Sequence, residues 1–97
     1  MAIGIADPAG TGDVQIMPAG KPAKLMGWSA VESAGAPALA TAVIRNGSTT
    51  SDPPVAVIGL LASTSQAERF GPQGIECPNG IFLDRVTGNT TFVVYVQ

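Results

Sequence analysis

Seven carboxylates are the residues of this sequence with the most obvious potential for chemistry. They are Asp7, Asp13, Glu32, Asp52, Glu68, Glu76 and Asp84. A hydrolase of the paired-carboxylate kind needs two such groups on one concave face, with one of them shielded from water. Here most stand in expected turns or beside a base, and in Glu68-Arg69 and Asp84-Arg85 a strand would send the two neighbours to opposite faces. We therefore interpret the carboxylates as solvated surface charges.

Nucleophilic and metal chemistry lack their usual residues. The sequence has no His, so a Ser-His-Asp relay has no base and the commonest metal ligand is missing. One Cys excludes an intrachain disulfide and a thiolate zinc site, and Cys77, just before Pro78, is predicted to be a half-buried small apolar residue. Gly10-Thr11-Gly12 lacks the third glycine of a dinucleotide fingerprint. We expect no catalytic residues, no bound cofactor and no metal, and therefore no enzyme.

Length and composition bound the class of protein. A chain of 97 residues makes one domain, and 12% charged residues with a net charge of −2 leave the surface poor in ions. Five scattered Lys and Arg residues do not make a nucleic-acid patch. The apolar stretches are too short to span a bilayer, and the start of the chain lacks a basic region followed by an apolar one. We expect synthesis in a cytoplasm, with no membrane partner.

The chain from Lys24 onward reads as short strands separated by turns. Strands are predicted at 24–32, 39–45, 55–61, 81–86 and 90–96, where large apolar and β-branched residues recur between turns, and 66–70 could be a further, more polar strand. The segments 71–74 and 77–80 place Pro second and Gly fourth, as turns do. Thr87-Gly88-Asn89 predicts a short hairpin. Helices at 36–44 or 55–67 are the alternative, against which Pro37 and Gly59 argue.

These strands predict an all-β fold: a small antiparallel β-sandwich or jelly-roll-like barrel over residues 24–97, with an extended N-terminal arm over residues 1–23. Alternating positions on paired strands should supply the core. The predicted core residues are Trp28, Val43, Val57, Leu61, Phe82, Phe92, Val94 and Val96.

The arm is dense in Pro and Gly, which prevents a helix and allows at most a short strand over residues 14–17. Its large apolar residues have few local partners, and we expect them to bind a neighbouring subunit. These partner-binding candidates are Ile3, Ile5, Val14, Ile16 and Met17. Deletion of residues 2–20 should then leave the sandwich folded and weaken assembly.

Four stretches carry a resemblance to a known group of proteins. They are 27–33 (GWSAVES), 40–47 (ATAVIRNG), 70–75 (FGPQGI) and 80–86 (GIFLDRV), the last followed by a Gly turn and an apolar strand. Together they cover residues 27–96, and the pattern resembles small β-sandwich structural proteins of tailed phages, especially those of actinobacterial hosts. The resemblance implies a virion component that decorates the capsid or belongs to the tail. The arm lies outside it.

Three functions follow from this reading. The first is a capsid decoration protein that bridges capsid subunits; its partners would be the major capsid protein or another virion protein and further copies of itself, with a trimer favoured. The second is a tail or head-fibre module that contacts the host surface. The third, from a different class, is a carbohydrate-binding lectin that stacks sugars on Trp28 or Tyr95.

Overall fold

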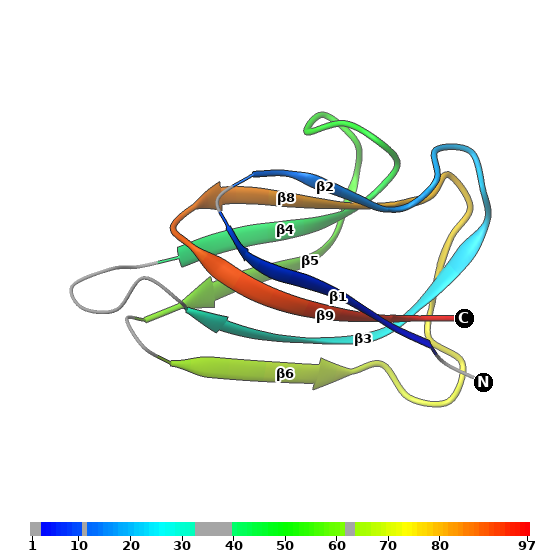
Figure 1. Cartoon of the computed structure of the whole chain (residues 1–97). Helices are drawn as coiled ribbons and strands as arrows, with labels where there is room; N and C mark the ends of the chain where they lie inside the picture. The colour runs from blue at the N-terminus through cyan, green and yellow to red at the C-terminus, as the bar shows by residue number, and fades with distance from the viewer. Residues whose placement is uncertain (1–2, 11, 33–39, 62–63) are drawn as a thin grey trace.

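The computed structural model describes residues 3–10, 12–32, 40–61 and 64–97. Within these ranges the chain forms strands and turns and no helix, so the helices at 36–44 and 55–67 are wrong wherever they overlap described residues. The strands are β1 (Ile3–Gly10), β2 (Val14–Met17), β3 (Ala23–Glu32), β4 (Ala40–Asn46), β5 (Pro54–Leu60), β6 (Ser65–Arg69), β7 (Ile75–Cys77), β8 (Ile81–Thr87) and β9 (Thr90–Val96). They build two antiparallel sheets packed face to face (Figure 1), which confirms the predicted β-sandwich.

The two sheets contain strands that are far apart in the sequence. Sheet A has the order β1-β9-β3-β6, with β7 also paired to β3, and sheet B has the order β2-β8-β4-β5. β1 pairs with β9 so that Ile3 lies opposite Val96, and the first and last strands are therefore neighbours. β1, β5 and β8 end at the same end of the sandwich, and there the chain crosses from β8 in sheet B to β9 in sheet A (Figure 1).

The predicted hairpin at Thr87-Gly88-Asn89 is wrong, because β8 belongs to sheet B and β9 to sheet A. Gly88 has the positive φ of 84° that a tight turn requires, so the local turn signal was read correctly. A turn of this kind does not determine whether the two strands pair or arch over one another. The arch prevails here because β8 pairs with β2 and β4, while β9 pairs with β1 and β3.

The core lies between the sheets and confirms half of the predicted residues. Trp28, Phe92, Val94 and Val96 are buried. The buried apolar core comprises Ile16, Ala23, Leu25, Trp28, Ala30, Ala40, Ala42, Ile44, Ile58, Leu60, Cys77, Ile81, Leu83, Phe92, Val94 and Val96. It is made by alternate positions of the strands, most clearly in β9, where buried and half-buried residues follow one another from end to end.

The other four predicted core residues lie on the outer face of sheet B. Val57 and Leu61 are 77% and 67% exposed, and Val43 and Phe82 are half-buried. The error is one of phase: residues 55–61 are apolar at almost every position, so alternation does not say which side faces inward. Ile58 and Leu60 face the core instead.

The predicted arm is part of both sheets in this structure. β1 forms one edge of sheet A and β2 one edge of sheet B, so the short strand predicted at 14–17 is confirmed and the rest of the arm is not a segment outside the sandwich. The boundary expected near residue 23 falls where β3 begins. Gly and Pro exclude a helix, as reasoned, but they do not prevent edge strands, which tolerate Pro and bulges.

Candidate functional site

The five partner-binding candidates of the arm do not share one exposed surface. Ile16 belongs to the core at 7% exposure, and Ile5, Val14 and Met17 pack against the core. Only Ile3 is largely exposed, at 63%. The expectation that these side chains stay uncovered within a single chain is therefore wrong for the other four. The reason is that the inward faces of β8 and β9, with Leu83 and Val94, supply the apolar neighbours that the arm itself lacks.

A second set of apolar side chains is exposed on sheet B. We call Val57, Leu61 and Val86 the apolar row; they are 77%, 67% and 55% exposed. Val57 and Leu61 flank Gly59 two residues away on either side, with Leu61 directly after the end of β5, so alternation directs residues 57, 59 and 61 outward. Val86 lies on β8. A shallow groove of about 230 Å³, lined by Ala40, Thr41, Gly59, Leu60 and Leu61, lies along β5.

Gly59 keeps that groove open. A Cβ built on Gly59 would find no atom within 4 Å, so the space above this position is empty. Thr41, opposite Gly59 on β4, binds the hydroxyl of Thr87 with 2.8 Å between the two oxygens. Leu61, at one end of the apolar row, therefore borders a depression lined by Gly59 and Thr41, a shape that fits an inserted side chain of a neighbouring protein.

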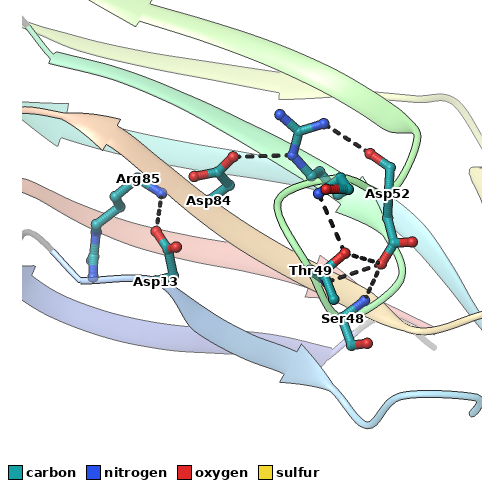
Figure 2. Close-up of polar contacts among 8 residues, drawn as sticks. Asp13, Ser48, Thr49, Asp52, Asp84 and Arg85 are labelled. Atoms are coloured by element: carbon teal, nitrogen blue, oxygen red, sulfur yellow. Dashed lines mark hydrogen bonds and ion pairs between the residues drawn. The ribbon is translucent and has the colours of Figure 1, made fainter.

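Next to the apolar row, an ion pair ties the middle strands of sheet B together. The Arg45 Nε atom of β4 lies 3.0 Å from Asp84 Oδ2 of β8, and Arg45 Nη1 donates to the Asp52 carbonyl oxygen at 2.8 Å (Figure 2). Asp84 is only 6% exposed. The interpretation of all carboxylates as solvated is wrong for Asp84, because the neighbouring strand supplies a cation that pairs with it. It is also wrong for Glu32 of β3, which is only 3% exposed.

The loop between β4 and β5 is organised around the Asp52 carboxylate (Figure 2). Its Oδ2 accepts hydrogen bonds from the backbone N–H groups of Ser48 at 2.7 Å and Thr49 at 2.9 Å, and from the Thr49 hydroxyl at 3.2 Å. A Cβ at Gly47 would overlap this carboxylate, so glycine is required there. The backbone hydrogen bonds lower the pKa of Asp52 below its ordinary value, because they favour the charged form.

Acid should reduce the contribution of this loop to the free energy of unfolding, and replacement of Asp52 by Asn should remove that pH dependence. A carboxyl whose pKa is lower in the folded chain contributes stability above its unfolded value of about 3.9, and that contribution is lost as the pH falls through the folded pKa. We expect the acid limb of the unfolding free energy to be shallower in Asp52→Asn than in the parent chain. Chemical denaturation between about pH 2 and 7 measures the two limbs; parallel limbs would contradict the assignment.

Arg85 is a buried cation that binds both Gly12, just before β2, and Thr90, at the start of β9. It is 7% exposed, donates from Nη1 to the Gly12 carbonyl at 3.0 Å, and donates to the Thr90 hydroxyl and carbonyl at 3.0 and 2.8 Å. Its backbone N–H donates to Asp13 Oδ1 at 2.9 Å (Figure 2). Sequence reasoning placed Asp84 and Arg85 on opposite faces of a strand, which is confirmed, but missed that Arg85 is the inward member.

Of the two aromatic residues expected to stack sugars, one is enclosed in the core. Trp28 is 5% exposed and its ring centroid lies 6.5 Å from that of Phe92, so it belongs to the core. Tyr95 is half-buried on the outer face of sheet A, where the Arg69 guanidinium carbon lies 5.3 Å from its ring centroid. That face is otherwise built from small residues and holds a shallow depression of about 390 Å³ beside Ser29, Ala67 and Val93.

Cys77 is more buried than the half-buried position predicted for it, with no exposed area. Burial raises the pKa of its thiol, because the thiolate would lose its hydration. The thiol is therefore held in its neutral form and acts as a small apolar side chain beneath the turn that begins at Pro78.

Among the residues that the structure describes, no three His, Cys, Asp or Glu side chains gather closely enough to hold a metal ion. The same residues include no helix that is long and apolar enough to cross a membrane. No protein-family model matches the chain, and no curated protein matches it significantly.

Proposed function

We propose that this chain is a structural protein of a tailed-phage virion, most specifically a capsid decoration protein that bridges neighbouring capsid subunits. The resemblance over residues 27–96 supports the class of protein, and the sandwich agrees with the fold which that resemblance implies. Its partners would be the major capsid protein or another virion protein, together with further copies of itself in a symmetric oligomer. The work it does is mechanical: added contact area holds the shell against internal pressure.

The apolar row is the observation that carries the proposal. Three large apolar side chains in a 97-residue chain are more than half exposed on one sheet. Exposed apolar side chains beside a groove are typical of an interaction site. Full burial of one such side chain contributes about 1.5–3 kcal/mol, so a few contacts of this kind, repeated around a shell, strengthen it considerably.

The proposal is tested by adding the labelled protein to expanded capsids that lack it. We expect binding across the whole shell, and at least tenfold weaker binding of the double variant Leu61→Ser/Val86→Ser, since two apolar contacts are lost. Gln73→Ser, in an exposed turn of the other end, is the matched control and should bind normally. Label confined to one vertex or to the tail would instead identify a tail or head-fibre module. Binding to glycans by the free protein would favour a lectin.

A further inference from the structure

The β5 edge of sheet B differs from the other sheet edges. β6 carries Glu68 and Arg69 and is exposed throughout, and β2 has only four residues and a shift of register. β1 contains Pro8 and an irregular register near its end. Charge, shortness, proline and bulges are the devices by which natural proteins keep sheet edges from pairing with other chains. These edges are therefore protected.

β5 carries almost none of these devices. It is seven residues long, has no charged residue and pairs on one side only, with β4. Its single proline, Pro54, stands at the first position, and its register irregularity lies beside it. Val57, near the middle, is the most exposed large apolar residue described. A long, apolar and uncharged edge in contact with water is a site for strand addition.

Backbone groups on this edge point outward and are available to a second strand. The Gly59 carbonyl accepts a hydrogen bond at 3.1 Å from Nε2 of Gln66, which lies outside sheet B on β6. Because alternate residues of a strand direct their N–H and C=O groups to the same side, Val57 directs its own pair away from β4 as well. A carbonyl oxygen has two lone pairs, so Gly59 can accept a further bond.

We propose that β5 pairs with β5 of a second copy of this chain, antiparallel and about a twofold axis at Val57. Antiparallel pairing of a strand with itself requires a twofold axis, so a dimer replaces the trimer expected from the sequence. The two copies would form one continuous eight-stranded sheet from two four-stranded ones. This inference concerns self-association: it uses Val57, which also belongs to the apolar row, but its test does not require that the chain binds a capsid.

The sequence of β5 complements itself in this register. Each Val57 lies opposite the same residue of the second copy, and Val55 lies opposite Gly59. Val55, which is partly buried against the core of its own chain, lies opposite the position where no atom lies within 4 Å of a built Cβ, so the second strand can approach without a clash there. No like charges oppose one another, because the strand carries none. The protected edge β6 lacks this property, since its outward carboxylate and guanidinium groups would remain in the interface.

Mass measurement in solution tests the proposal, with Val57→Lys as the variant. We expect the parent chain to be a dimer at micromolar concentration, and Val57→Lys to dimerise at least tenfold more weakly, because two cations would face each other across the axis. Gln73→Lys adds the same charge in an exposed turn and should remain dimeric. Mixing Val57→Lys with Val57→Glu should restore a mixed dimer, because the opposed residues then carry opposite charges.

Amide hydrogen exchange on the parent chain gives a readout that does not depend on a variant folding. The Val57 and Gly59 N–H groups should be protected in the dimer and should exchange rapidly on dilution to the monomer. A parent chain that is monomeric or trimeric, a Val57→Lys dimer as tight as the parent, or exchange at Val57 that is independent of concentration would each overturn the proposal. If each variant is monomeric by itself and the mixture forms a dimer, residue 57 of one copy lies opposite residue 57 of the other.

Discussion

Replacement of Phe92 by Ala is expected to lower the free energy of unfolding by about 3–5 kcal/mol. Phe92 has no exposed area, lies on β9 between β1 and β3, and packs near Trp28. The Arg85 guanidinium carbon also lies 5.9 Å from its ring centroid. Truncation would leave a cavity where the two sheets meet and would remove one side of the Arg85 environment.

Phe82 provides the matched control for this experiment. It was predicted to be a core residue like Phe92, but it is half-buried on the outer face of β8. Phe82→Ala should therefore lose clearly less stability than Phe92→Ala, because little cavity is created. Urea denaturation of both variants at equal protein concentration measures the difference. Equal losses, or a loss below about 1 kcal/mol for Phe92→Ala, would contradict the observed core.

Deletion of residues 2–20 is expected to abolish cooperative folding, contrary to the expectation from the sequence. The deletion removes β1 and β2, and with them Ile16 from the core and the edges that cover β9 and β8. It also removes the Gly12 carbonyl and the Asp13 carboxylate from Arg85. The guanidinium keeps its hydrogen bonds to Thr90, but a buried donor left without its acceptor costs about 1–3 kcal/mol, and the lost core contacts add to this in a small domain that has only about 5–15 kcal/mol in total.

Circular dichroism and thermal melting of the truncated chain test this expectation. Ile3→Ala is the control, since that side chain is largely exposed and its loss should leave the melting temperature nearly unchanged. A truncated chain that melts as cooperatively as the parent would show that β1 and β2 are dispensable, as a detachable arm would be.

Local patterns predicted the elements of this fold well. The runs of Val, Ile and Thr located β4, β5, β8 and β9, and the spacing of the apolar residues and turns located β3 and the more polar β6. The Pro and Gly spacing located the turn at 77–80, where the Gly80 N–H donates to the Cys77 carbonyl. The short β7 was missed because Ile75-Glu76-Cys77 has no alternation long enough to recognise. Pairing was beyond these patterns, since β1 joins β9 only through contacts remote in sequence.

The candidate surface could be predicted less well than the fold. Val57 and Leu61 were placed in the core because an unbroken apolar run has no visible phase, yet their exposure is what makes β5 a candidate interface. The neighbouring strand β4 does show which face points outward, because Thr41 and Arg45 alternate with apolar residues. Since β4 pairs with β5, this alternation also indicates which residues of β5 face outward. Arg85 gave no such signal, since a buried cation is recognised only when its carbonyl partners are seen.

The central position of β9 has a consequence for the order in which the chain acquires its structure. β9 lies between β1 and β3 and is formed by residues 90–96, so sheet A has a gap until that segment has left the ribosome. Until then the apolar faces of β1 and β3 remain exposed to water during synthesis. Chains dominated by such remote pairings fold in milliseconds to seconds, and their unfinished forms are prone to aggregate. A stalled or shortened nascent chain that lacks β9 should therefore engage chaperones, whereas completion of this single strand closes the sheet.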